Sequence, residues 1–187
     1  IGLNILSDFY HHSALMNAGK QQVVVMGKIL NDDQKQALLW DVERGIPDRP
    51  QARHWQTCTC IGDWHYNQST YNNNRYKSAA HVIRMLVDIV SKNGNLLLSV
   101  PVRANGTIDE KEEAIVKGIG AWMKVNQQSI YSTRPWKTFG EGPLAEAVNP
   151  MTGQGFNEGI KYSAKDVRYV VRKDTVFATI MAWPEAG

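Results

Sequence analysis

The chain has 187 residues, of which 43% are hydrophobic and 21% are charged, a composition typical of a globular protein of ordinary domain size. It contains no uninterrupted apolar run of about 18 residues, so the sequence predicts no membrane-spanning helix. The formal net charge is only +3 and the basic residues are scattered, which argues against a nucleic-acid-binding protein.

Helix and strand patterns alternate along the first part of the chain. Residues 3–17 repeat apolar side chains at helical spacing, and residues 22–27 form a β-branched run that predicts a buried strand. A short helix is expected over residues 32–38, and the apolar run 39–42 predicts the next strand. This order of strand, helix and strand is typical of a parallel sheet.

The same alternation continues to residue 126. We expect strands over residues 55–61 and 95–100, and helices over residues 78–92 and 107–126. Residues 63–76 are rich in Asn and too polar to pack, so they are expected to form a loop at the rim of the sheet. The sequence therefore predicts an α/β fold whose near-continuous apolar strands pair in parallel.

A change of pattern marks the C-terminal part of the chain. Residues 142–159 are rich in Gly and Pro, which is typical of a linker between domains. Beyond them, alternating side chains over residues 167–171 and 176–180 predict a β-hairpin. Because an isolated hairpin is barely stable in water, we expect residues 160–187 to be the start of a β-sandwich that continues further.

The two cysteines of the chain, Cys58 and Cys60, lie two apart on an expected strand. Alternation places both thiols on one face of the strand, and a disulfide across one intervening residue would be strained. We therefore expect two small, packed, free thiols. A metal site would need more ligands nearby than the sequence offers, so none is predicted.

Two charged residues follow expected strands. Lys28 follows the run 22–27 and Glu43 follows the run 39–42, so each lies at the carboxyl end of a strand, where parallel barrels place functional groups. On the residues alone, the simpler interpretations are a surface lysine, and a surface glutamate paired with its neighbour Arg44.

Aromatic residues come shortly after Glu43. Trp55 begins the next expected strand, and Trp64 and Tyr66 lie in the rim loop that follows it. Flat aromatic rings accept the C–H face of a pyranose, and a carboxylic acid can protonate a glycosidic oxygen. An acid beside such rings favours a sugar site, although Trp64 could equally serve as an anchor for its loop.

Five short motifs follow one another over nearly the whole chain. They are Glu-Arg-Gly from residue 43, Trp-Gln-Thr from residue 55, Ile-Gly-Asp-Trp-His-Tyr-Asn from residue 61, Ser-Lys-Asn-Gly-Asn-Leu-Leu-Leu from residue 91 and Thr-Arg-Pro-Trp-Lys from residue 133. With these motifs the chain resembles the alpha-L-fucosidases of glycoside hydrolase family 29. Five matches in series are far more specific than any one of them.

The resemblance implies a fold and a reaction. The family has a catalytic barrel followed by a C-terminal β domain, so residues 1–141 would form the C-terminal half of a (β/α)8 TIM-like barrel. Family members are retaining exo-glycosidases that remove terminal alpha-L-fucosyl residues, which implies a carboxylate nucleophile and a separate acid/base. The implied partner is a fucosylated oligosaccharide or glycoconjugate, and no cofactor or metal is implied. A secreted, periplasmic or lysosomal location is implied, although no signal peptide is visible in this chain.

The resemblance also implies roles for single residues. Glu43 corresponds to the general acid/base, and Trp64 corresponds to an aromatic wall of the fucose pocket. Further substrate contacts are expected from Trp55, Lys28 and Tyr66.

The family's nucleophile has no match in this chain. It is an aspartate at the end of an earlier strand, and Asp8 lies in the middle of an expected helix and cannot replace it. We therefore expect a polypeptide cut at both ends that is inactive by itself. Arg44 is expected to point away from Glu43, because a guanidinium paired with that carboxyl would oppose an acid role.

Two alternatives remain open on the sequence. Aromatic residues without a paired nucleophile also fit a non-catalytic carbohydrate-binding or structural module. An unrelated parallel α/β enzyme that uses Glu43 and Lys28 as acid and base would explain these two residues but not the five motifs.

Overall fold

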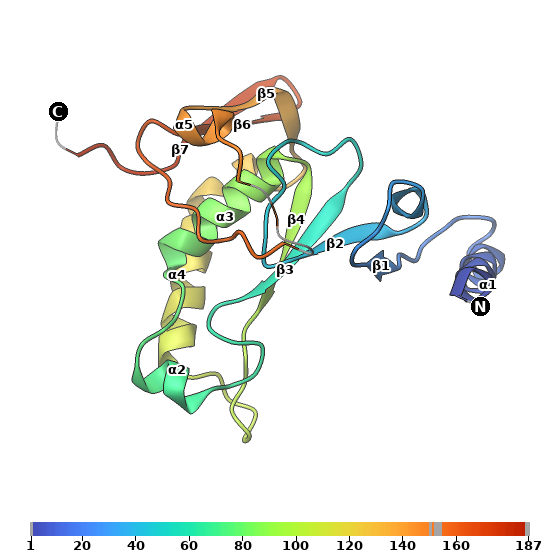
Figure 1. Ribbon diagram of the computed structural model, residues 1–187, viewed down its shortest axis with the longest axis horizontal. Coiled ribbons are helices and arrows are strands. Elements are labelled where there is room, and N and C mark those ends of the chain that lie inside the picture. Colours follow the sequence, from blue (N-terminus) through green and yellow to red (C-terminus); the bar gives the residue numbers. More distant parts are fainter. Residues whose placement is uncertain (1, 150, 152–154, 186–187) are drawn as a thin grey trace.

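The computed structural model describes residues 2–149, 151 and 155–185. The described residues form a four-stranded parallel sheet of order β1-β2-β3-β4 and a three-stranded antiparallel sheet of order β5-β6-β7, with α3 and α4 packed alongside (Figure 1). In chain order, the elements are α1 (Gly2–Met16), β1 (Met26–Gly27), the 3-10 helix η1 (Gln34–Gln36), β2 (Leu39–Glu43), β3 (Trp55–Cys60), α2 (Gln68–Asn72), α3 (Ala79–Ser91), β4 (Gly94–Ser99), α4 (Glu110–Asn126), the 3-10 helix η2 (Gln127–Ser129), β5 (Arg134–Glu141), α5 (Pro143–Glu146), β6 (Val167–Arg172) and β7 (Thr175–Ile180).

The parallel sheet buries one face against α3. Alternation along the strands sends Val42 and Trp55 to this face, where they pack with Met85 and Ile89 of α3. Met26 and Leu97 point to the other face and are 47% and 53% exposed. Parallel sheets usually have both faces covered, whereas within the described residues helices cover only one. The parallel α/β prediction is confirmed, and closure of the sheet into a barrel stays a prediction.

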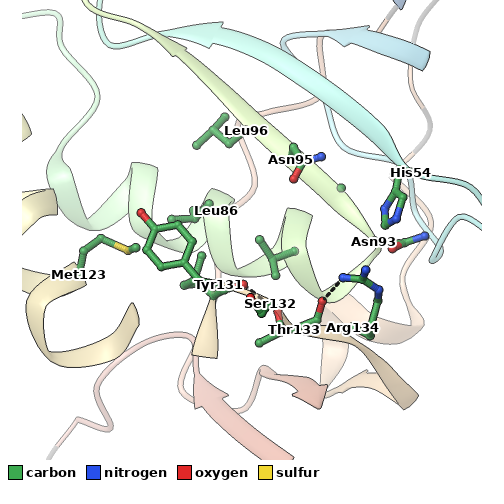
Figure 2. Close-up of a pocket in the computed structure, with 13 residues that line it drawn as sticks. His54, Leu86, Asn93, Asn95, Leu96, Met123, Tyr131, Ser132, Thr133 and Arg134 are labelled. Atoms are coloured by element: carbon green, nitrogen blue, oxygen red, sulfur yellow. Dashed lines mark hydrogen bonds between the residues drawn. The ribbon is translucent and has the colours of Figure 1, made fainter. Parts of the chain in front are cut away.

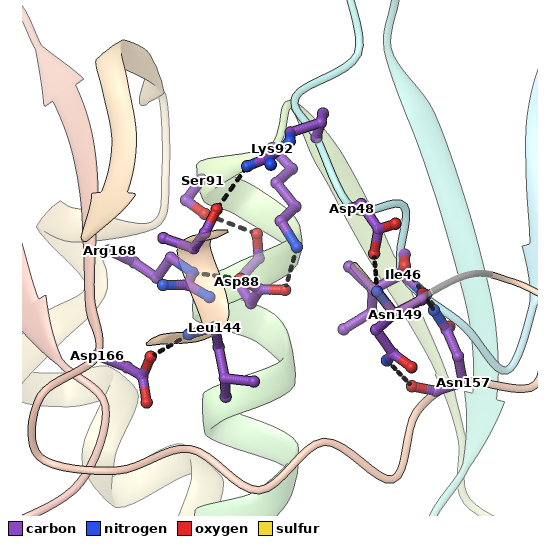
Figure 3. Close-up of polar contacts among 12 residues, drawn as sticks. Ile46, Asp48, Asp88, Ser91, Lys92, Leu144, Asn149, Asn157, Asp166 and Arg168 are labelled. Atoms are coloured by element: carbon purple, nitrogen blue, oxygen red, sulfur yellow. Dashed lines mark hydrogen bonds and ion pairs between the residues drawn. The ribbon is translucent and has the colours of Figure 1, made fainter. Parts of the chain in front are cut away.

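A buried ion cluster joins α3 to the antiparallel sheet (Figure 3). Asp88 on α3 is fully buried and contacts Arg168 on β6, and it accepts a 2.8 Å hydrogen bond from Lys92. Burial lowers the pKa of Lys92 and outweighs the opposing effect of Asp88. Strand β4 of the parallel sheet and strands β5 and β6 of the antiparallel sheet all contact α3, so this helix joins the two sheets.

Helix α4 begins at a cap that also creates a buried acid. The Asp109 carboxylate accepts hydrogen bonds from the backbone N–H groups of Lys111 and Glu112, so Asp109 caps the helix. The Glu112 side chain is buried, and among the described residues its Oε2 atom has no hydrogen-bond partner. Burial, with the nearby Asp109 charge, raises the pKa of Glu112 to about 7.

The first expected strand is much shorter than predicted. Only Met26 and Gly27 pair with β2, opposite Leu39 and Trp40. Val24, in the β-branched run expected to be buried, is 58% exposed. Within the described residues β1 is an edge strand that pairs only with β2, so it has little surface to bury against, and β propensity alone did not produce a long strand here.

Two elements appear that the residue pattern did not predict. Helix α2 forms in the polar rim loop because the Asn67 side chain accepts from the N–H groups of Ser69 and Thr70. Strand β5 pairs with β6 in the antiparallel sheet, although its residues were assigned to the barrel part. The register of β5 with β6 shifts between Pro135 and Gly140. Such a shift interrupts the regular alternation of apolar and polar side chains by which a strand is predicted from sequence.

Helix α1 lies apart from the other helices, at the end of the molecule beside β1 (Figure 1). Its contacts with the next segment include a 2.7 Å hydrogen bond from the Tyr10 hydroxyl to the Ala37 carbonyl. Several of its apolar side chains are exposed, among them Leu3, Ile5 and Leu15. None of the helices in the described part of the chain is both long and apolar enough to cross a membrane.

We expect the substitution Asp88→Asn to destabilise the protein by about 3–5 kcal/mol, because it leaves the buried Arg168 and Lys92 without their counter-charge. Urea denaturation followed by circular dichroism measures the change. Asp32→Asn is the matched control, since Asp32 pairs with Lys35 from a fully exposed position and the variant should lose well under about 1 kcal/mol. Equal stability of the two variants would contradict the assigned role of the cluster.

We also expect Glu112→Gln to change how stability depends on pH. The folded protein favours the neutral form of Glu112. The stability that this side chain contributes is therefore fully present below a pH of about 4.5, and it is lost as the pH rises through about 7. The glutamine variant should therefore have a free energy of unfolding higher than the parent's at pH 8, by on the order of 1–3 kcal/mol, and similar to the parent's at pH 5. Thermal unfolding at the two pH values tests this, and a parallel pH response of both proteins would refute it.

Candidate functional site

Polar side chains gather on the open face of the parallel sheet. Asp41 and Glu43 lie two apart on β2 and therefore point to the same face. In the register of β2 with β3, Asp41 lies opposite Gln56 and Glu43 lies opposite Cys58. Lys28 follows β1 directly, so its side chain reaches the same row. Five polar or thiol side chains from three neighbouring strands thus meet at one place.

The ammonium group of Lys28 joins the two carboxylates. Its Nζ atom lies 2.7 Å from Asp41 Oδ2 and 2.8 Å from Glu43 Oε2. It also donates to the Cys58 thiol at 3.0 Å. Gln56 completes the cluster by donating to Asp41 Oδ1 at 3.2 Å.

Lys28 stays charged in this environment. Although partial burial disfavours the ammonium ion, hydrogen bonds to Asp41, Cys58 and Glu43 raise its pKa above the ordinary value. An ammonium group has three protons to donate, and here it has three partners. Lys28 was expected to contact substrate, but in this arrangement it has no proton left for a sugar hydroxyl.

Glu43 is placed at the carboxyl end of β2, as the sequence predicted. Its side chain is 16% exposed, so it does not face open solvent. The neighbouring Arg44 turns away to Glu158, which its Nε and Nη2 atoms contact at 2.8 and 2.7 Å. The expectation that Arg44 points away from Glu43 is confirmed.

Trp55 does not lie on the face that carries Glu43. It is only 1% exposed, packs against Trp40, and donates from its indole Nε1 to the Lys92 carbonyl at 2.9 Å. Its expected role in substrate contact is therefore wrong. The reason is that side chains alternate between the two faces of a strand. Trp55 and Thr57 point to the face covered by α3, whereas Cys58 points to the opposite face, which carries Glu43.

Trp64 and Tyr66 lie on the loop that follows β3. Trp64 is 39% exposed, and the Tyr66 ring stacks against Arg103, whose guanidinium carbon lies 5.6 Å from the ring centre. None of the hydrogen bonds or ion pairs of Glu43 in the described part of the chain involves these aromatic residues. Their expected roles at a fucose pocket stay predictions.

The cysteines behave as expected. Cys58 and Cys60 are both free and buried. Burial raises the pKa of the Cys58 thiol, partly offset by Lys28, so the sulfur stays protonated and is a poor nucleophile.

A separate cavity of about 340 Å³ lies at the opposite end of the sheet, where β3 and β4 begin (Figure 2). Figure 2 shows His54, Asn93 and Arg134 on one side of it and Met123 and Tyr131 on the other. Its described lining contains no carboxylate and no cysteine. It offers no acid for glycosidic chemistry, so the cluster around Glu43 is the better candidate.

Asp41 and Gln56 are members of the site that the sequence analysis did not single out. A signal for Asp41 was present, because it lies two residues before Glu43 and therefore shares its face. For Gln56 the signal was weaker, since its side depends on the register between β2 and β3.

The chain matches a known family. Residues 6–128 match the model of the Alpha-L-fucosidase family, which is more than half of the chain. The human plasma alpha-L-fucosidase is 27% identical over 147 residues, which cover 78% of this chain and 27% of the human protein.

Solved structures agree with this match. An alpha-L-fucosidase superposes with a TM-score of 0.63 at 23% identity, over 79% of this chain and 30% of that one. The Thermotoga maritima alpha-L-fucosynthase in complex with alpha-L-Fuc-(1-2)-beta-L-Fuc-N3 superposes with a TM-score of 0.54 at 25% identity, over 68% and 25% of the respective chains. This chain thus spans less than a third of the length of these relatives. Because the family match covers residues 6–128 and includes the strand that carries Glu43, the chain belongs to the alpha-L-fucosidase family.

Proposed function

We propose that the protein contributes to a retaining exo-glycosidase that removes terminal alpha-L-fucosyl residues from glycoconjugates, with Glu43 as the general acid/base. The observation that carries the proposal is the position of Glu43. It ends a parallel strand within the family match, and its carboxyl group is partly buried on the face of the sheet that the helices leave open.

The proposed chemistry assigns Glu43 two proton transfers. In the first step its carboxyl group gives a proton to the glycosidic oxygen as the bond to the leaving group breaks. In the second step its carboxylate takes a proton from the water that attacks the glycosyl–enzyme intermediate. Both steps require the carboxyl group to be held in one direction, which its contact with Lys28 supports.

Lys28 serves in this proposal as a positioning residue. The ammonium group 2.8 Å from Oε2 fixes the direction of the carboxyl group. Like a guanidinium in that place, it favours the second step, in which Glu43 is a base, over the first, in which Glu43 is an acid. The raised pKa of Lys28 keeps this positive charge in place. It also opposes the rival enzyme in which Lys28 is a general base, because a base must first lose its proton.

Asp41 does not fit the role of the nucleophile. Since Asp41 and Glu43 contact the same ammonium nitrogen, their oxygens lie no more than about 5.5 Å apart, close to the roughly 5 Å between the carboxyl groups of retaining glycosidases. However, the Lys28 ammonium fills the gap where the anomeric carbon would have to lie. We propose no nucleophile among the residues that the structure describes.

The substrate and location follow the family. The T. maritima relative is named for its complex with a fucosyl disaccharide, which supports a terminal fucose as the sugar bound by this protein. A relative named as a plasma enzyme supports a secreted or lysosomal location. Trp64 and Tyr66 are retained in the proposal as sugar contacts of the rim loop, and Trp55 is not.

A non-catalytic carbohydrate-binding or structural module is the remaining alternative. It predicts that Glu43 is dispensable for any turnover, whereas the enzyme proposal predicts the opposite. Kinetics of a Glu43 variant separate the two.

We expect Glu43→Gln in the full-length protein to slow hydrolysis of a fucosyl disaccharide by about 100-fold or more, which is the usual contribution of a general acid. Hydrolysis of 4-nitrophenyl alpha-L-fucoside should suffer much less in the first step, because nitrophenolate leaves without protonation. Steady-state kcat/KM on both substrates measures this difference. Asp48→Asn, which changes a carboxylate that accepts from the Asn149 N–H group outside the cluster, is the control and should affect both substrates alike. An equal loss on both substrates in Glu43→Gln would count against the acid role.

A further inference from the structure

A segment far along the chain holds the end of β2. Residues 155–158, here called the strap, lie beside Glu43, Arg44 and Ile46. Strand β1 pairs with β2 only opposite Leu39 and Trp40 and does not extend to Glu43. At Glu43 the strap pairs with β2 in place of β1. Gly155 forms a parallel bridge to Glu43, and the Phe156 N–H group donates to the Glu43 carbonyl at 2.9 Å.

Asn157 extends this pairing to the next turn of the chain. Its side-chain oxygen accepts from the Ile46 N–H group at 2.8 Å, and its side-chain nitrogen donates to the Ile46 carbonyl at 3.0 Å. Figure 3 shows Asn157 beside Ile46, with Asn149 bound on its other side. One side chain thus satisfies both backbone groups of Ile46, much as a neighbouring strand would.

Glu158 completes the strap with a carboxylate that has four contacts. Its Oε1 atom pairs with Arg44 and, at 3.0 Å, with Lys77, while its Oε2 atom accepts from the Thr59 hydroxyl at 2.5 Å. Glu158 is buried, yet hydrogen bonds from Thr59 and Lys77 together with both cations lower its pKa. The carboxylate is therefore charged and firmly held.

The backbone at Arg44 is the reason that such support matters. Arg44 has a φ of 46°, in the left-handed region that residues with a side chain adopt only at a steric cost. Strained conformations of this kind persist where the surroundings impose them. Contacts from two guanidinium nitrogens to Glu158 Oε1 fix the Arg44 side chain, and the hydrogen bond from the Phe156 N–H group fixes the Glu43 carbonyl just before it.

We propose that Glu158 is a positioning residue for Glu43. By holding Arg44 in its left-handed conformation, Glu158 sets the direction in which the preceding residue presents its carboxyl group to substrate. This inference rests on the proposed acid/base role of Glu43. It assigns a part in the reaction to a residue 115 positions downstream of Glu43, which does not itself touch the sugar.

The test compares leaving groups in the full-length protein. Glu158→Gln keeps the size of the side chain and removes the charge that Arg44 and Lys77 need. If Glu43 is displaced as a result, kcat/KM on a fucosyl disaccharide should fall by about tenfold or more, and kcat/KM on 4-nitrophenyl alpha-L-fucoside by no more than about threefold, because kcat/KM reports the first step, in which nitrophenolate needs no proton. Glu158→Asp, which restores the charge, should recover part of the loss on the disaccharide.

A matched variant separates positioning from general destabilisation. Asp166 is also a buried, hydrogen-bonded carboxylate, but it binds the N–H groups of Leu144 and Ser163 and not the end of β2. Asp166→Asn should lower both activities by the same factor, because it reduces only the amount of folded protein. An equal loss on both substrates in Glu158→Gln, or no loss on either, would overturn the proposal.

Two further variants keep the result interpretable. If Glu158→Gln does not fold, Arg44→Lys removes the paired guanidinium contacts to Glu158 Oε1 while keeping the charge, and it should show the same preference for loss on the disaccharide. Glu43→Gln in the same assay tests the acid role itself. If Glu43→Gln loses more activity on the disaccharide than on the nitrophenyl substrate, but the Glu158 and Arg44 variants do not, the positioning role alone is refuted. If Glu43→Gln itself shows no such difference between the two substrates, the proposed function is refuted.

Discussion

The ammonium group of Lys28, held between two carboxylates, is the interaction on which the candidate site depends. Asp41 and Glu43 lie on one face of one strand, so without a counter-ion their charges would repel each other. Lys28 can reach both only because β1 lies beside β2 in a parallel register. The first pairing of the sheet and the arrangement of the site are therefore stabilised by the same contacts.

The end of β2 is held from two directions by parts of the chain that are distant in sequence. On the open face Lys28 orients the Glu43 side chain, and at the strand end the strap orients the backbone through Phe156 and Glu158. Side-chain and backbone restraint together can fix a reacting carboxyl group within the narrow tolerance that catalysis requires. The segment that carries the strap connects β5 with β6, so the antiparallel sheet is linked directly to the candidate site.

Helix α3 connects the two sheets by two different kinds of contact. Its apolar side chains, including Met85 and Ile89, cover one face of the parallel sheet, while Asp88 binds Arg168 of β6 without exposure to water. An apolar contact tolerates small shifts, whereas a buried ion pair requires one geometry. The Asp88–Arg168 pair therefore adds a directional contact to the placement of β6 on α3.

The sequence pattern was sufficient to predict the strand Trp55–Cys60 and the helix Ala79–Ser91. In both elements the spacing of apolar residues that are close in sequence indicates which face is buried. The pattern also placed Glu43 at a strand end. It misassigned Trp55, since the face on which a strand residue lies is decided by pairing with neighbours and not by residue type. The pairs Lys28–Asp41 and Arg44–Glu158 could not be predicted either. They join residues brought together only by strand register and by the path of the chain between sheets, so tertiary structure alone decided which charges meet.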